Sequence, residues 1–88
     1  MPSYLVETYL ARGRAEERAA REERARSAAE ELTRAGSRVQ FDGAIHVPED
    51  EICFFVFDAA SSHDAALVAE LAELRPLRVV EAVSSGSG

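Results

Sequence analysis

The sequence predicts an α+β domain whose elements follow the order strand, helix, strand, strand, helix, strand. Three observations lead to this prediction. Two stretches, Tyr4 to Leu10 and Ile52 to Phe57, are rich in β-branched and aromatic residues. Residues 14–34 contain no glycine or proline and consist mostly of strong helix formers. The chain has 88 residues, which is enough for one domain with a small core.

The first predicted helix, 14–34, carries its apolar face in its second half. The apolar positions share one face through the spacing i, i+3, i+4, i+7: Ala25, Ala28, Ala29 and Leu32. The alanines of the first half point elsewhere, so we expect that half to pack less firmly on a sheet. Ala35 and Gly36 supply the helix end.

A hairpin is predicted in the middle of the chain. Residues 39–47 alternate between apolar and more polar side chains, which predicts a strand whose half-polar side carries Gln40, Asp42 and His46, with Gly43 as a candidate bulge. The following Pro-Glu-Asp cannot continue the strand and predicts a turn. Residues 51–58 should therefore return antiparallel beside 39–47.

The last elements are a second helix and a short strand. Ser61 or Ser62 is expected to cap the helix, and Arg75 followed by Pro76 ends it. Residues 77–83 predict the final strand, and 84–88 predict a flexible Ser/Gly tail. The chain is therefore expected to form a single domain over 1–83.

This order of elements is that of the ferredoxin-like, split-βαβ fold, in which two helices cover one face of a four-stranded antiparallel sheet. Successive side chains of a strand point to opposite sides, and both sides are apolar in residues 52–57. Two helices cover only one of these sides. We expect the other side to be an interface between two copies, as in dimeric α+β barrels, or the wall of a ligand cavity.

Composition excludes several classes of protein. The formal net charge is −6, and all ten cations are arginines interleaved with acids, which argues against a nucleic-acid partner. No hydrophobic span predicts a membrane segment, and the single cysteine cannot form an internal disulfide. Without a signal-peptide pattern at the N-terminus, the expected location is the cytoplasm. The arginine and alanine content suggests a GC-rich bacterial genome.

A small set of residues is suited to binding a divalent metal ion. The hairpin would place His46 near Cys53, and Asp50 lies in the turn between two glutamates. Glu7 interrupts an apolar strand and is a further candidate ligand. The spacing matches no strong metal motif, and the simpler interpretation makes these residues a core cysteine, a surface histidine and an ordinary turn. His63, near the start of the second helix, is expected in solvent.

A cofactor-free enzyme of the dimeric α+β barrel kind is the alternative hypothesis, such as a cyclase, isomerase or monooxygenase. It would need an acid or base in a cavity, for which the candidates are Glu7, Asp42, His46, Tyr4 and Tyr9. No nucleophile triad, phosphate loop or dinucleotide motif is present in the sequence. A structural or regulatory interaction module is the third hypothesis, and it needs none of these sites.

Three segments resemble a known family. These are the opening 1–10 (MPSYLVETYL), the central 46–51 (HVPEDE) followed by Cys53 and Phe54, and the closing 78–83 (RVVEAV). They are similar to a family of small bacterial proteins of unassigned function whose described representative is a nickel-binding, ferredoxin-like homodimer. The resemblance implies the same fold, a homodimer and binding of a nickel-like ion.

Together these arguments predict a small cytoplasmic homodimer that binds a divalent metal ion or a small ligand. His46 is the first residue to test, and Asp50, Cys53 and Glu7 are the secondary candidates for metal ligands.

Overall fold

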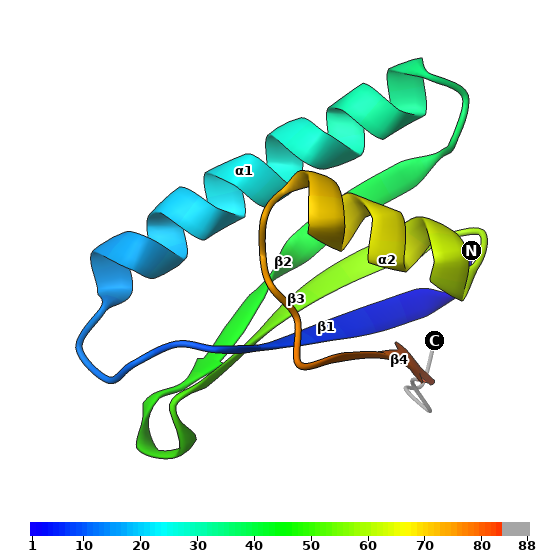
Figure 1. Cartoon of the computed structure of the whole chain (residues 1–88). Helices are drawn as coiled ribbons and strands as arrows, with labels where there is room; N and C mark the ends of the chain where they lie inside the picture. The colour runs from blue at the N-terminus through cyan, green and yellow to red at the C-terminus, as the bar shows by residue number, and fades with distance from the viewer. Residues whose placement is uncertain (84–88) are drawn as a thin grey trace.

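The four-stranded sheet of this protein carries both helices on the same face (Figure 1). The computed structural model describes residues 1–83. Its elements are β1 (Ser3–Tyr9), α1 (Ala15–Arg34), β2 (Val39–Val47), the 3₁₀ turn η1 (Pro48–Asp50), β3 (Ile52–Ala59), α2 (Ser62–Leu71) and β4 (Arg78–Ala82). The strand order is β2-β3-β1-β4, and every neighbouring pair is antiparallel. The predicted ferredoxin-like fold is confirmed, while the expected tail 84–88 lies outside the described residues.

Buried and partly exposed residues alternate along β1 and β3, which places the core between the sheet and the helices. Every second residue of β1 and β3 is buried, beginning with Tyr4 and Cys53 respectively. The helices meet these side chains with small residues, because alanines dominate the buried positions of α1 and α2. The residues buried on the helices are Ala25, Ala28, Ala29, Ala65, Val68 and Ala69. Small side chains let the helices approach the bulky Phe55 and Phe57 of β3, which are fully buried.

Helix α2 begins as predicted and ends earlier than predicted. The Ser61 hydroxyl accepts a hydrogen bond from the Asp64 N–H at 3.2 Å, which is an N-cap. The helix ends at Leu71, and Glu73 and Arg75 adopt positive φ angles of 57° and 53°. The buried Leu74 N–H donates to the carbonyl of Ala69 at 3.0 Å, which closes the helix end before Pro76 is reached.

A bulge in β2 changes the side on which its residues lie. The register with β3 shifts between Phe41 and Gly43, so Asp42 is an extra residue, and Gly43 has a φ of 138° that favours glycine. Gln40 lies on the side away from the helices, whereas His46 pairs with a buried residue of β3 and lies on the helix side. The expectation that Gln40, Asp42 and His46 share one half-polar side is therefore wrong, because one extra residue inverts the alternation.

We call the side of the sheet away from the helices the open face. A residue lies on this face when it alternates with the buried residues of β1 or β3, or when it pairs with such a residue from a neighbouring strand. Eight large apolar side chains meet this condition: Leu5, Tyr9, Ile45, Val47, Ile52, Phe54, Val56 and Val80. Tyr9 and Ile45 are 55% and 54% exposed. The open face is therefore apolar although no described segment of the chain covers it.

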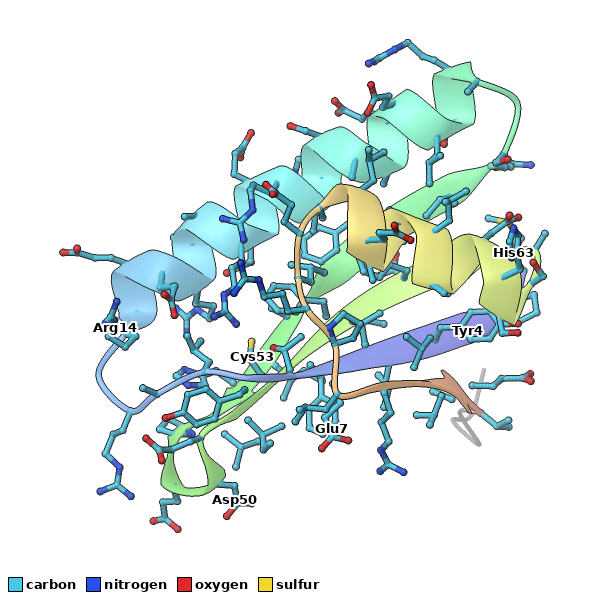
Figure 2. All side chains as sticks on the ribbon, viewed as in Figure 1. Tyr4, Glu7, Arg14, Asp50, Cys53 and His63 are labelled. Atoms are coloured by element: carbon cyan, nitrogen blue, oxygen red, sulfur yellow. The ribbon has the colours of Figure 1, made fainter. Side chains whose placement is uncertain are left out.

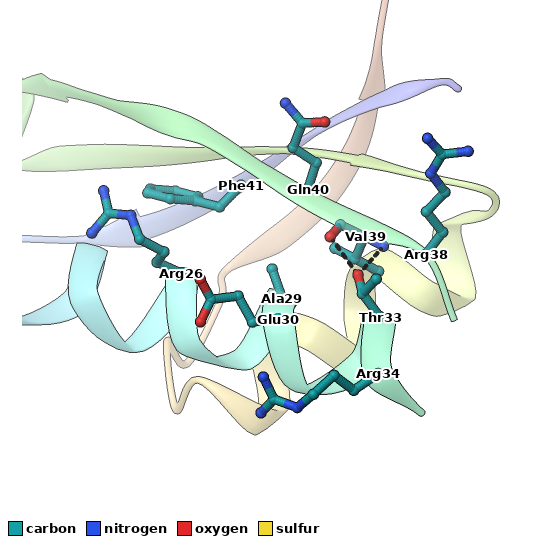
Figure 3. Close-up of a pocket in the computed structure, with 9 residues that line it drawn as sticks. All are labelled: Arg26, Ala29, Glu30, Thr33, Arg34, Arg38, Val39, Gln40 and Phe41. Carbon is teal, nitrogen blue, oxygen red and sulfur yellow. Dashed lines mark hydrogen bonds between the residues drawn. The ribbon is translucent and has the colours of Figure 1, made fainter. Parts of the chain in front are cut away.

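Thr33 of α1 closes one end of the edge strand β2. Its hydroxyl accepts a hydrogen bond from the Val39 N–H at 3.1 Å and donates one to the Val39 carbonyl at 2.9 Å (Figure 3). Both backbone groups of Val39 thus bond to a side chain of the helix. This contact fixes the C-terminal end of α1 against the start of β2.

Candidate functional site

Three polar side chains form a row across the helix-covered side of the sheet. His46 of β2 pairs with Cys53 of β3, and Cys53 pairs with Thr8 of β1. Directly opposed residues in an antiparallel pair have Cβ atoms about 5 Å apart, so the three side chains are neighbours. We call these three residues the polar row. Thr8 and Cys53 are fully buried, and the Thr8 hydroxyl donates to the Cys53 carbonyl at 2.8 Å.

His46 is the unsatisfied member of the polar row. Its side chain is half-buried, yet its Nε2 atom has no contact with solvent and no hydrogen-bond partner among residues 1–83. Buried polar nitrogens nearly always have a partner, and leaving one without a partner costs about 1 to 3 kcal/mol. This nitrogen is therefore available to a donor, an acceptor or a metal ion.

The first half of α1 places charged side chains above this end of the sheet. Its alanines are exposed, and the half-buried positions are all charged: Glu17, Arg18, Arg21, Glu22 and Arg24. Arg21 donates to the Tyr9 carbonyl at 2.8 Å and pairs with a glutamate one turn away at 3.0 Å. Arg18 and Glu22 approach to 3.4 Å. The buried positions of α1 all lie in its second half, so the first half is held to the sheet by polar contacts.

The environment of Cys53 favours its neutral thiol. Burial raises the pKa of Cys53, the positive charges of Arg18 and Arg21 lower it in part, and the negative charge of Glu22 raises it again. A thiol of this kind is a weak nucleophile at neutral pH, and it would have to lose its proton to bind a metal ion.

The four predicted metal ligands are not all brought together. His46 and Cys53 are neighbours on the helix side, as the predicted hairpin required. Asp50 is exposed in η1, and Glu7 lies on the open face, where it points away from the helices (Figure 2). Over residues 1–83, no three side chains of His, Cys, Asp or Glu are grouped so that they could hold a metal ion.

The candidate acids and bases of the enzyme hypothesis are also divided between the two sides of the sheet. Tyr4 is buried in the core, and His46 shares that side. Glu7 and Tyr9 lie on the open face, and Asp42 lies at the bulge. His63 is exposed at the start of α2, as expected (Figure 2).

A charged pair lies on the open face between β1 and the edge strand β4. Glu7 stands opposite Phe54 on one side and Arg78 on the other, and the Arg78 Nε donates to Glu7 Oε1 at 2.7 Å. The Glu7 side chain is 18% exposed and that of Arg78 is 66% exposed. Sequence reasoning missed Arg78, although the predicted fold places the last strand beside the first and so brings a cation within reach of Glu7.

Two further carboxyl groups lie at one end of the open face. The Ser3 hydroxyl donates to Asp58 at 2.6 Å, and the Gln40 amide donates to Asp42 at 3.2 Å. Burial, a hydrogen bond with Asp58 and the negative charge of Asp58 raise the pKa of Asp42, and the hydrogen bond from Gln40 partly offsets this. The contact between Asp42 and Asp58 could not be predicted from the sequence, since it depends on the register around the bulge.

A groove of about 580 Å³ runs between the second half of α1 and the start of β2 (Figure 3). Arg26, Arg34 and Arg38 line it together with Glu30, and Arg26 lies over the Phe41 ring at 5.7 Å. Figure 3 shows Arg26 at one end of the groove and Arg38 at the other, so these guanidinium groups do not converge on one point. The groove therefore lacks the focused set of donors that a small anion requires.

Comparison with models of protein families, with curated proteins and with solved structures finds no match. Among the described residues, no helix is both long enough and apolar enough to cross a bilayer.

Proposed function

We propose that this protein is an interaction module that acts as a homodimer, in which two copies stack through their open faces. The observation that carries this proposal is the set of eight large apolar side chains on a sheet face that no described segment covers. Exposed apolar patches of this kind are typical of protein interfaces. Both helices contact the opposite face, so neither shields this one (Figure 1).

The size of the open face is sufficient for a specific dimer. Four strands spaced about 4.8 Å apart, with about seven residues each at 3.4 Å per residue, give a projected area of roughly 450 Å² per copy. Two stacked copies would then bury roughly 900 Å² in projection and more in accessible surface, close to the 1,000 Å² that a biological interface requires. A sheet-on-sheet stack also needs no change in the strands, because their side chains already stand perpendicular to the sheet.

The experiment is a measurement of molecular mass in solution by sedimentation velocity over a range of protein concentrations. We expect a dimer of wild-type protein at micromolar concentration and a monomer of Ile45→Lys, because a lysine on the open face would be buried without a partner. Leu71→Lys is the matched control, since Leu71 is 44% exposed on α2, on the other side of the sheet. A monomeric wild type, or equal dimerisation by Ile45→Lys, would contradict the proposal.

A second candidate function, binding of a divalent metal ion such as nickel, is favoured by one observation. The unpartnered Nε2 of His46 lies beside the Cys53 side chain, and imidazole and thiolate suit nickel, zinc, copper and cobalt ions. We propose His46 and Cys53 as the ligands. Asp50 and Glu7 do not support this site, because they lie in the exposed turn and on the open face.

Calorimetric titration of metal-stripped protein with Ni²⁺, Zn²⁺, Cu²⁺ and Co²⁺ tests the metal proposal. We expect saturable binding at a fixed ratio per chain, lost in His46→Ala and retained in His63→Ala, which removes the exposed histidine. Absence of binding tighter than about 0.1 mM, which corresponds to about −5 kcal/mol, would end the proposal.

A further inference from the structure

The groove between α1 and β2 gathers positive charge in an acidic protein. Three arginines and one glutamate line it, whereas the whole chain has a formal net charge of −6. All three arginines are exposed, and Arg34 and Arg38 form no ion pair with a carboxylate among residues 1–83. Arg26 pairs with Glu23 at 3.0 Å, and both of these side chains are exposed. An anionic partner can therefore reach the three cations without breaking a buried contact.

An apolar floor connects the charged ends of the groove. It consists of Ala29, Val39 and Phe41. The Phe41 ring packs on the core rings of Phe55 and Phe57, with centroid distances of 6.3 and 5.3 Å, so its position is fixed. A partner can bury apolar atoms on such a floor without first ordering it, which lowers the entropic cost of binding.

The cations at the two ends of the groove stand apart by a length that suits an extended peptide. Arg26 lies over the Phe41 ring at one end, and Arg38 stands at the other end (Figure 3). Phe41 follows Arg38 by three residues, which corresponds to about 10 Å of extended chain. A small anion cannot bridge this distance, whereas four residues of a polyproline II segment place their first and last side chains about 9 Å apart on one side. Figure 3 shows Glu30 between the two arginines, so an acid in the middle of the segment would be repelled.

We propose that this groove binds an extended acidic segment of a partner protein, in which two acidic residues lie three positions apart with uncharged residues between them. The two carboxylates bind Arg26 and Arg38, and the side chains between them cover the Phe41 ring. Recognition of acidic motifs by arginine clusters is a recurring mode of peptide binding. Glu30 disfavours a nucleic acid, which carries a charge at every backbone position. This surface lies on the helix side of β2, so the inference goes beyond the proposed homodimer and does not depend on it.

Fluorescence anisotropy with a labelled synthetic peptide tests this proposal. The probe is Gly-Ser-Glu-Leu-Ala-Glu-Ser-Gly, and the matched control peptide has Gln in place of both Glu. We expect saturable binding of the probe, at least about tenfold tighter than that of the control peptide, because two charge pairs are lost in the control. A probe whose two Glu are adjacent should also bind more weakly, since it cannot reach both arginines. Absence of saturable binding below about 1 mM, or equal binding of the three peptides, would overturn the proposal.

Charge reversal in the protein locates the peptide. We expect Arg38→Glu to weaken binding of the probe at least about tenfold, because repulsion replaces attraction at one end of the groove. Arg12→Glu is the matched control, since it makes the same charge change at an exposed residue before the other end of α1. Arg12 precedes the helix start, which lies about 16 Å along the axis from Arg26, beyond the Debye length of about 10 Å at 0.1 M salt. Binding by Arg12→Glu should therefore stay within about twofold of wild type.

A compensating exchange distinguishes a specific contact from a general effect of charge. Arg38→Glu should regain binding to one of the two peptides in which Lys replaces a single Glu, and the identity of that peptide gives the direction of the bound segment. Equal losses in Arg38→Glu and Arg12→Glu would overturn the proposal, and so would tighter binding of a single-stranded oligonucleotide than of the probe. Circular dichroism checks that each variant folds, and Arg38→Gln, expected to weaken binding about threefold, is the milder variant. Sedimentation velocity tests the homodimer separately, so either proposal can fail without the other.

Discussion

The two faces of the sheet use the same strands and nearly the same kinds of side chain, yet they differ in what covers them. In β3 the helix-side residues Cys53, Phe55 and Phe57 are fully buried, whereas the alternate residues Phe54 and Val56 remain partly accessible. Hydrophobicity alone therefore does not decide burial in this protein. The position of the two helices decides it. The apolar character of the open face indicates that this face needs a cover, which the described residues of a single chain do not supply.

The polar groups on the two faces differ in the same way. On the helix side, Thr8 satisfies its hydroxyl within the chain, while His46 leaves one buried nitrogen unsatisfied. On the open face, the partly satisfied groups belong to the ion pair of Glu7 and Arg78, which joins β1 to the edge strand β4. Among the described residues, the helix side thus has one buried polar atom without a partner, whereas the ion pair of the open face is still partly in contact with solvent.

Truncating the two neighbouring phenylalanines of β3 is the largest test of this comparison. We expect Phe55→Ala to lower the free energy of unfolding by about 3 to 5 kcal/mol, because it leaves a cavity in the core. Phe54→Ala should cost the monomer only about 1 kcal/mol, because that ring is partly exposed there. Urea denaturation at a concentration where the chain is monomeric measures both. Equal losses would show that the open face is covered within the chain.

The bulge in β2 decides which of its residues belong to which face, and it depends on Gly43. We expect Gly43→Ala to lower the free energy of unfolding by about 1 to 3 kcal/mol, because φ is 138°. An added Cβ would meet no atom within 4 Å, so the cost arises from the backbone and not from a clash. A loss below about 0.5 kcal/mol in urea denaturation would show that the bulge rearranges freely.

Replacing His46 tests the one unsatisfied group of the covered face. We expect His46→Val to raise the free energy of unfolding by about 1 kcal/mol, because it removes a buried nitrogen without a partner from a strand. Metal-free protein is required for this measurement by thermal or urea denaturation. His63→Val, at an exposed position, should stay within about 0.5 kcal/mol of wild type. A marked loss of stability in His46→Val would mean that the imidazole already has a partner.

The smallest expected effect concerns the carboxyl pair on the open face. The pKa of Asp42 is raised in the folded chain, so the folded state binds more protons than the unfolded state, and the stability from this group grows as the pH falls and is lost as the pH rises. Asp42→Asn should therefore raise the free energy of unfolding at pH 7 by up to about 0.5 kcal/mol, with a smaller gain in acid. Unfolding curves from pH 3 to pH 7 measure this, and Glu81→Gln should show no such trend.

Much of the fold could be predicted from the sequence because its signals are local. The alternation in 52–57 and the alanine spacing in α1 each reflect the period of one element. The side on which His46 lies could not be predicted, because the pattern of β2 does not reveal which residue the bulge adds. The end of α2 was also placed too late, because the turn at Glu73 depends on the burial of Leu74.

The candidate site was predictable only in part, for a related reason. The pairing of His46 with Cys53 follows from the hairpin, which the turn residues indicate. Glu7 lies on the other side of the sheet because it pairs with Phe54, an open-face residue of β3. The sequence does not specify this register before the strands are aligned. Arg78 became a partner of Glu7 through a pairing between strands at opposite ends of the chain.

The contact of Thr33 with Val39 has a consequence for how far association can proceed. A sheet with a free edge can add strands from other molecules without limit, and this is a common route to fibres. Here the Thr33 hydroxyl binds both outward backbone groups of Val39, and the bulge a few residues later breaks the regular spacing of the next ones. Growth along the hydrogen-bonding direction is thereby obstructed at β2, which leaves β4 as the only edge of the described sheet without such an obstruction and prevents endless addition of β2 to β4.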